Sequence, residues 1–197
     1  MLSHYEKMRA GQWYDANYDP DILAKREAAK SRAHRFNQVD PADRKEAEAA
    51  LAKLLGDLSE GLEVMAPLYV DYGDNIHFGK HCFVNHACYF MDGARIEFGD
   101  HVFIGPYCGF YTAAHPLRAE ARNAGLEQAR PIKVGSDCWF GANVSVMPGV
   151  SIGSGSVIGA GSVVTKDIPE NSLVMGVPGR VIKTIDQDQG NSFTNEP

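Results

Sequence analysis

His115 is the residue whose type and surroundings most directly suggest chemistry. It lies in the string Thr-Ala-Ala-His-Pro at residues 112–116, inside a polar stretch, 111–133, that interrupts a strict repeat. An imidazole titrates near neutral pH and can take a proton from an alcohol. A lone histidine before proline could equally be a loop residue held by a hydrogen bond, and the stretch could equally be a tolerated surface insertion. The residues alone leave these alternatives open.

The four cysteines have a structural explanation. No two of them form a C-x-x-C pair of the zinc or redox type, and a disulfide framework is not expected in a chain of 197 residues. All of them occupy an interior position of the repeat described next, where small side chains are needed. We therefore interpret them as core residues and not as nucleophiles. They are Cys82, Cys88, Cys108 and Cys138.

Apolar residues recur at every sixth position from Tyr72 onward. Neither a helix nor an alternating strand has this spacing. It is typical of the hexapeptide repeat of a β-helix, in which three short strands close one triangular coil. Glycine follows many of these anchors, at corners where a side chain would be crowded. The three series are Tyr72, Phe78, Val84 and Phe90; Phe98, Ile104 and Phe110; and Val134, Phe140, Val146, Ile152, Ile158 and Val164.

The fourth residue after each anchor gives an independent check, because it also faces the narrow interior and should be compact. We predict an all-β-dominated fold, a single-stranded left-handed parallel β-helix with an N-terminal helical segment. Such repeats cannot bury their surface alone, so stacking and oligomerisation are expected. The checked positions hold Ile76, Cys82, Cys88, Ala94, Val102, Cys108, Cys138, Val144, Val150, Ser156 and Ser162.

The first 60 residues lack the repeat and are typical of helices and loops. Asp19-Pro20 predicts a helix that ends near Phe36, because proline after an aspartate cap is a start signal. Asp40-Pro41 predicts a second helix that runs to about Leu55. We predict a helical segment at 1–60, a β-helix domain at 61–186 that carries the 111–133 loop, and a polar tail at 187–197.

Composition limits the partners. The formal net charge of -6, the pI near 5.6 and the lack of a Lys/Arg-rich tract argue against nucleic acid. No apolar run approaches the roughly 20 residues that span a bilayer, and residues 1–10 lack the apolar core of a secretion signal. We expect a cytoplasmic protein without a membrane partner, in which any anionic cofactor meets a local basic cluster.

The chain resembles the maltose and galactoside O-acetyltransferase family of hexapeptide-repeat proteins. The resemblance rests on TAAHP at 112–116, VIGAGSVVTKDIP at 157–169, GVPGRVIK at 176–183 and a helical start beginning Met8-Arg9-Ala10-Gly11, and it extends to about Asp186. It implies an enzyme that moves acetyl from acetyl-CoA to a hydroxyl of a sugar or sugar-like acceptor. It also implies a homotrimer with active sites between subunits and no required metal.

The resemblance assigns three catalytic residues. The loop histidine of the family is the general base, here His115, so no covalent enzyme intermediate is needed. Glu127 lies where some members place a carboxylate that orients the histidine and stabilises the imidazolium; a solvated surface charge is the alternative. Asn85 matches a residue close to the acceptor hydroxyl and the acetyl group, although asparagine at a corner also tolerates a left-handed backbone.

The resemblance also places the acceptor in part on the helical segment. Asp15 and Arg26 match residues that contact the acceptor sugar, since carboxylates and guanidinium groups bind hydroxyls well. Asp71 and Asp92 are further candidates for the same pocket. Trp139 is expected to flank the acetyl or acceptor pocket. The alternatives are ordinary surface charges and, for the tryptophan, an aromatic residue packed at a trimer seam.

For the cofactor, the resemblance implies a groove of backbone amides between coils and a basic cluster near the C-terminal coils. The basic side chains would meet the phosphates of CoA. The amide of Ala142 would stabilise the oxyanion of the tetrahedral intermediate, which demands an N–H and no particular side chain. The cofactor residues are Ala142, Ala160, Thr165, Lys166, Arg180 and Lys183.

Two other functions fit the same fold. A carbonic-anhydrase-like trimer would bind zinc between subunits through histidines, and His77, His81, His86 and His101 are available. A non-catalytic β-helix scaffold is the third possibility. It gives no reason for the His115 loop or for the basic residues near the C-terminal coils.

Overall fold

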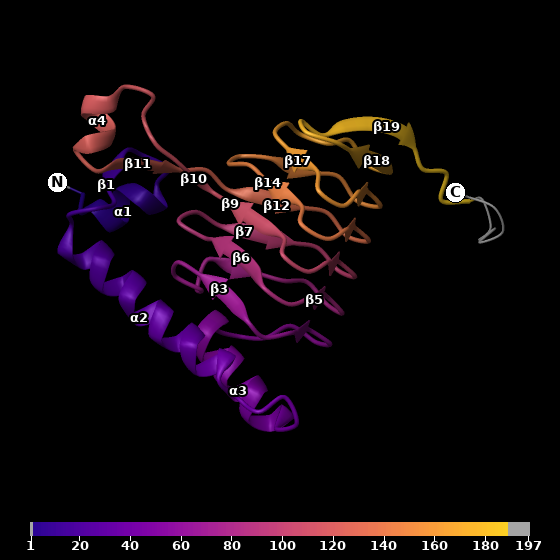
Figure 1. Cartoon of the computed structure of the whole chain (residues 1–197), viewed down its shortest axis with the longest axis horizontal. Coiled ribbons are helices and arrows are strands. Elements are labelled where there is room, and N and C mark those ends of the chain that lie inside the picture. Colours follow the sequence, from indigo (N-terminus) through magenta and orange to yellow (C-terminus); the bar gives the residue numbers. More distant parts are fainter. Residues whose placement is uncertain (1, 189–197) are drawn as a thin grey trace.

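The computed structural model describes residues 2–188, which begin with a helical segment and continue as a stack of triangular coils (Figure 1). The helices are α1 (His4–Arg9), α2 (Pro20–Asn37) and α3 (Arg44–Leu55). The prediction for α2 is confirmed: the Asp19 side chain caps the helix by accepting from the Ile22 amide at 3.0 Å, and Pro20 is its first residue. The predicted polar tail, 187–197, lies outside the described residues from position 189 onward.

The predicted start of α3 is wrong by three residues. Asp43, not Asp40, caps the helix by accepting from the Glu46 amide at 3.0 Å. Asp40 instead caps a tight turn, in which its side chain accepts from the Ala42 amide at 2.9 Å. Aspartate followed by proline starts turns as well as helices, so the sequence signal was ambiguous.

The coils form a left-handed parallel β-helix of about six turns, as predicted. Each coil visits three faces in a fixed order, and successive coils pair in parallel register. The seven-stranded face contains β2 (Glu63–Val64), β5 (Phe83–Val84), β8 (Phe103–Ile104), β13 (Trp139–Phe140), β16 (Val157–Ile158), β18 (Ser172–Met175) and β19 (Arg180–Thr184). The five-stranded face contains β3 (Leu68–Val70), β6 (Cys88–Met91), β9 (Gly109–Tyr111), β14 (Ser145–Val146) and β17 (Val163–Val164). The four-stranded face contains β4 (Ile76–His77), β7 (Ile96–Phe98), β12 (Ile132–Val134) and β15 (Ser151–Ile152).

The interior is a column of apolar side chains. Twelve of the thirteen predicted anchors are buried, and Phe78 is partly buried. The bulky anchors stack on one another: Phe90 lies parallel to Phe110 with ring centroids 5.1 Å apart, and Phe110 meets Phe140 edge-on. All four cysteines are buried and free, which confirms their interpretation as core residues.

The corners between faces require close approach of successive coils. A Cβ on Gly141 would lie 2.7 Å from the amide nitrogen of Ala160 in the next coil, so the position needs glycine for space. The left-handed backbone occurs elsewhere in the corners, for example at Ala87 and Asn143. Asn85 does not adopt it, so the backbone explanation offered for this asparagine is wrong.

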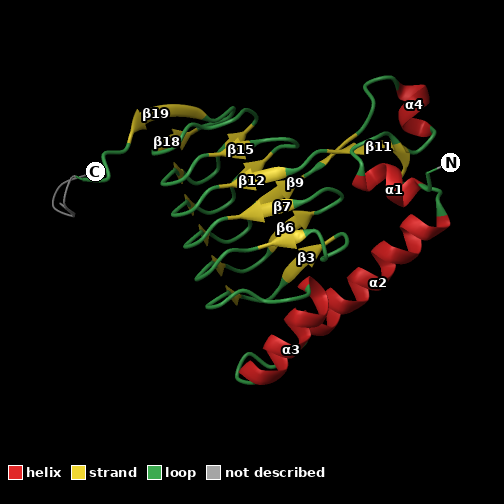
Figure 2. Ribbon diagram, turned by 180° about the vertical axis from the view of Figure 1, so that it is seen from behind, coloured by secondary structure: helices red, strands yellow, loops and turns green. Residues whose placement is uncertain are grey.

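The stretch predicted as a loop has its own secondary structure. It contains β10 (Ala113–Ala114), α4 (Ala119–Asn123) and β11 (Leu126–Ala129). β11 pairs antiparallel with β10 on one side and with β1 (Tyr14–Asp15) of the helical segment on the other. Figure 2 shows this small sheet beside α1, away from the stacked coils. The N-terminal segment therefore supports the loop directly.

No helix within residues 2–188 is both long and apolar enough to cross a membrane.

Candidate active site

The ring of His115 is fixed through one nitrogen. Nδ1 lies 3.0 Å from the backbone carbonyl oxygen of Leu126, in the neighbouring strand β11. A carbonyl oxygen only accepts, so Nδ1 must carry the proton and donate. Nε2 of the neutral ring therefore has a free lone pair. This is the arrangement that a base needs.

Glu127 lies next to that free nitrogen. Its Oε2 is 3.5 Å from Nε2, and its side chain is only 13% exposed. A carboxylate at this position can stabilise the positive charge that the ring gains when Nε2 takes a proton during catalysis. Two groups therefore share the role that the sequence assigned to Glu127. The Leu126 carbonyl accepts from Nδ1 and so orients the ring and fixes its tautomer, and the Glu127 carboxylate faces Nε2, the nitrogen that would take the proton.

Tyr14 holds the other oxygen of Glu127, a contact that sequence reasoning missed. The two residues are register partners in the β1–β11 pair, and the Tyr14 hydroxyl donates to Oε1. Tyr14 is fully buried. Burial, followed by the negative charge of Glu127, raises the pKa of this phenol well above its ordinary value, so it stays neutral and donates.

A cavity of about 520 Å³ opens beside the imidazole. Its size falls within the roughly 300–1,000 Å³ range of small-molecule pockets. It carries both charged and amide groups suited to hydroxyls, together with aromatic surface. The lining includes Asn17, Arg26, Asp71, Tyr111, His115 and Glu127.

Arg26 lies in this cavity as predicted from the sequence, whereas Asp15 does not line it. One oxygen of Asp15 accepts from the amides of Asn17 and Tyr18, at 3.0 and 2.9 Å, and closes the turn before α2. Asn17, two residues further on, lines the cavity instead. The sequence signal identified the correct turn but the wrong side chain in it.

Of the two remaining aspartates, one lines the cavity and the other does not. Asp71 lines the cavity and accepts from the hydroxyl of Tyr89 at 2.6 Å. Asp92 has no exposed surface and accepts from the backbone amides of Tyr72 and Gly73, at 2.8 and 2.7 Å. Burial raises the pKa of Asp92 to about 6 despite these bonds. Asp92 therefore supports the first coils, and its proposed contact with the acceptor is wrong.

The predicted cofactor residues Ala142 and Ala160 lie elsewhere, at the edge between the seven- and five-stranded faces. They occupy successive coils, and both are exposed. Their amide groups donate no hydrogen bond to any acceptor within residues 2–188. Amides without an acceptor at this exposed edge can donate to the carbonyl groups of a pantetheine arm.

The C-terminal hairpin brings the basic candidates to the same end of the molecule. The Val163 amide donates to the Gly176 carbonyl at 3.1 Å, and the Gly179 amide donates to the Val163 carbonyl at 2.7 Å. These bonds fold the turn that precedes Arg180 against β17, which runs directly into Thr165 and Lys166. Lys183 is an exposed residue of β19, in register with Leu173.

Asn85 and Trp139 lie near Ala142 and Ala160 and not with His115, whereas Thr165 and Lys166 follow β17 at the edge from which the His115 loop leaves. Asn85 precedes Gly105 and Gly141 in the column along the edge between the seven- and five-stranded faces. Trp139 is 56% exposed on the seven-stranded face, in register with the half-exposed Phe103. The His115 loop leaves the opposite edge of the five-stranded face. A single chain therefore holds two separate groups of candidate residues.

The comparisons with known proteins agree with this fold. The maltose acetyltransferase hexapeptide capping motif matches residues 7–59, and the hexapeptide repeat of succinyl-transferase matches residues 131–166. A Staphylococcus haemolyticus protein that carries the provisional name of acetyltransferase is 56% identical over 187 residues, which cover 95% of this chain and 97% of that protein.

Solved structures extend the likeness over nearly the whole chain. A maltose O-acetyltransferase from Clostridium difficile 630 is 41% identical with a TM-score of 0.91, covering 94% of this chain and 99% of that one. A galactoside acetyltransferase in complex with coenzyme A is 32% identical with a TM-score of 0.90, covering 100% and 98%. An acetyltransferase from Vibrio cholerae, solved with acetyl coenzyme A, is 37% identical with a TM-score of 0.85, covering 94% and 100%.

The left-handed β-helix and the matches to known proteins place the chain in the class of hexapeptide-repeat acyltransferases. Within that class, the chain belongs to the maltose and galactoside O-acetyltransferase family and is an acetyltransferase. The zinc alternative is not favoured. Among residues 2–188, His81 stacks on His101 with centroids 5.2 Å apart, and no group of three or more His, Cys, Asp or Glu side chains could hold a metal ion.

Proposed function

We propose that the enzyme transfers acetyl from acetyl-CoA to a hydroxyl of a sugar or sugar-like acceptor, with His115 as general base. The observation that carries the proposal is the Nδ1 bond to the Leu126 carbonyl, which leaves Nε2 free in a residue that lines a polar cavity. The hydroxyl proton passes to Nε2 as the oxygen attacks, and Glu127 stabilises the imidazolium. The proton later leaves with the thiolate of the departing CoA.

The cavity supports a polyhydroxylated acceptor. Arg26 offers donors and Asp71 offers an acceptor oxygen, while Asn17 can do both. Tyr111 and Tyr89 add aromatic surface on the floor of the cavity, which suits the apolar face of a sugar ring. The mixture of paired polar groups with aromatic surface favours a neutral sugar over a purely ionic acceptor.

Acetyl-CoA, when bound, supplies a thioester carbonyl for attack by the acceptor oxygen. The free amide of Ala142 is the proposed donor to the oxygen on which negative charge develops, and the free amide of Ala160 is a donor for the pantetheine arm. Arg180, Lys166 and Lys183 supply positive charge for the phosphates, with Thr165 beside them. These basic side chains would provide local positive charge for an anion in a chain of net charge -6.

Assembly as a homotrimer would unite the two groups of candidate residues. His115 and Asn85 leave opposite edges of the five-stranded face, so the base of one subunit needs the amide groove of a neighbour. Trp139 and Phe103 form an exposed aromatic row on the seven-stranded face, as expected where a subunit packs. We propose that each active site lies between two subunits, in a protein located in the cytoplasm.

The direct test is acetyl-CoA turnover over a panel of acceptors. Thiol release should depend on added glucose, maltose or a galactoside and should be slower with amino-bearing drugs. Mass spectrometry of the product should find the acetyl group on oxygen. Thiol release that no sugar stimulates would refute the acceptor assignment, even if another acceptor were found.

Tyr14→Phe should lower kcat about tenfold and lower the free energy of unfolding by no more than about 1.5–3 kcal/mol. The variant removes the hydroxyl that holds Glu127 and leaves the buried ring in place. Hydrogen bonds to charged groups contribute about 1.5–3 kcal/mol, and 1.4 kcal/mol of barrier corresponds to tenfold in rate. Steady-state kinetics with saturating substrates measure the effect.

Tyr5→Phe is the matched control for Tyr14→Phe. Tyr5 packs against the same buried cluster, and its ring contacts Lys25. Its hydroxyl should not affect turnover. Equal kcat values for both variants and the wild type would show that Tyr14 has only a packing role.

A further inference from the structure

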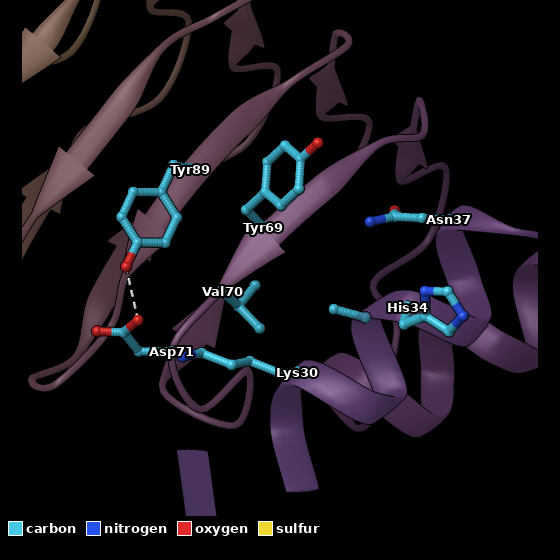
Figure 3. Close-up of a pocket in the computed structure, with 8 residues that line it drawn as sticks. Lys30, His34, Asn37, Tyr69, Val70, Asp71 and Tyr89 are labelled. Carbon is cyan, nitrogen blue, oxygen red and sulfur yellow. Dashed lines mark hydrogen bonds between the residues drawn. The ribbon is translucent and has the colours of Figure 1, made fainter. Parts of the chain in front are cut away.

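A second cavity, of about 320 Å³, continues from the first along helix α2. Lys30, Asp71 and Tyr89 line both cavities, so the two share a wall. Figure 3 shows Tyr69 and Tyr89 side by side on the strands, with Lys30, His34 and Asn37 on the helix opposite them. Together the cavities form one groove between α2 and the five-stranded face, which we call the α2 groove.

One polar stripe of α2 forms the wall of the α2 groove. Arg26, Lys30, His34 and Asn37 are spaced by four, four and three residues, which places them on one side of a helix. Arg26 lines the first cavity, Lys30 both, and the last two the second. With a rise of about 1.5 Å per residue, Arg26 to His34 spans about 12 Å. A single sugar ring cannot occupy that length.

Tyrosines from three successive coils form the floor. Tyr69 and Tyr89 are register partners on β3 and β6, and Tyr111 meets Tyr89 edge-on with ring centroids 6.0 Å apart. Gly109 makes this possible, because a Cβ there would lie 2.2 Å from the Tyr111 hydroxyl. Tyr69 is 49% exposed, an unusual position for a large aromatic side chain on a strand facing a helix.

We propose that the second cavity binds a second sugar ring of the acceptor, with Tyr69 as its stacking platform. This inference rests on the proposed function and adds to it a residue that sets the preference for acceptor length, because only a glycoside of at least two linked rings would reach Tyr69. Polar partners remain at the rim. Asn37 uses its amide on the backbone of Leu68, but the exposed Lys30 and His34 are placed to donate to hydroxyls, and Asp71 is placed to accept from them.

Tyr69→Ala tests the subsite through acceptor length. With acetyl-CoA saturating, kcat/KM for maltose should fall about five- to tenfold, the scale of one lost aromatic stacking contact, while kcat/KM for glucose stays within about twofold. Tyr69→Phe retains the ring and should behave as the wild type with both sugars. Thermal unfolding of both variants checks that the fold is intact.

Binding provides a readout that does not depend on turnover. Saturation-transfer difference NMR with maltose should show contacts in the wild type and in Tyr69→Phe and weaker ones in Tyr69→Ala. Equal losses for glucose and maltose, or no loss for either, would overturn the subsite while acetyl transfer to sugars stood. If maltose binding depends on Tyr69 but no sugar is acetylated, the subsite is supported and the proposed reaction is refuted.

Discussion

His115→Ala should lower kcat about 10²- to 10⁴-fold, the contribution typical of a positioned general base. Affinity for acetyl-CoA should stay within about twofold, because the amides of Ala142 and Ala160, proposed for the acetyl group and the pantetheine arm, lie at another edge of the β-helix. The ring is 43% exposed and its Nδ1 bonds a single carbonyl, so the substitution leaves no buried polar group without water. Pre-steady-state and steady-state thiol release, with binding of CoA measured by calorimetry, separate the two quantities.

His77→Ala is the control for His115→Ala. His77 is an exposed histidine of β4 on the four-stranded face and lines neither cavity of the α2 groove. Its removal should leave kcat unchanged. If His115→Ala kept more than about a tenth of the wild-type kcat, another group would have to take the hydroxyl proton, and the role of Glu127 would need to be revised with it.

Mixed oligomers should recover activity that neither parent has. His115→Ala lacks the base, and Asn85→Ala lacks the amide beside the proposed acetyl site, so each homo-oligomer should retain about 1% of wild-type activity or less. In a random equal mixture of subunits, about a quarter of the interfaces join an intact His115 to an intact Asn85. Denaturing and refolding the two variants together should therefore restore about a quarter of wild-type turnover.

The double variant provides the control for this complementation. A mixture of His115→Ala with His115→Ala/Asn85→Ala contains no subunit with His115 and should stay inactive after the same refolding. If each active site lay within one chain, no mixture of the two single variants would contain a site with both His115 and Asn85 intact. Failure of the two single variants to complement, with oligomers formed normally, would refute the shared active site.

The fold could be predicted because the repeat leaves few alternatives. A six-residue spacing of buried anchors such as Phe98, Ile104 and Phe110 fits only three short strands per coil, and the compact interior positions explained the cysteines without reactivity. The helical segment was harder. Asp19 and Asp40 carry the same Asp-Pro signal, but only the first caps a helix, because tertiary contacts decide which turn is extended.

The site was predicted in part. His115 and Arg26 line the cavity, but the contributions of Tyr14 and Asn17 left no signal in the sequence. The strands β1 and β11 are too short to show periodicity, and an aromatic residue after a helix is most often part of a core. Asp15 and Asn17 lie in one turn, and only the hydrogen bonds of that turn determine which of them faces the cavity.

The pairing of β1 with β11 also sets the order in which the enzyme becomes competent. Tyr14 and Glu127 are 113 residues apart in the chain, so a strand made at the start of translation waits, unpaired, until β2 to β9 of the coils and then β11 have been made. Contacts between residues so far apart in the sequence form late in folding, because closing the long intervening loop costs conformational entropy. His115 lies close in sequence to Leu126 and Glu127, but Glu127 acquires its Tyr14 partner only when the N-terminal strand pairs with β11. A chain in which this pairing has not formed would therefore have structured coils before the partner of its base was held in place.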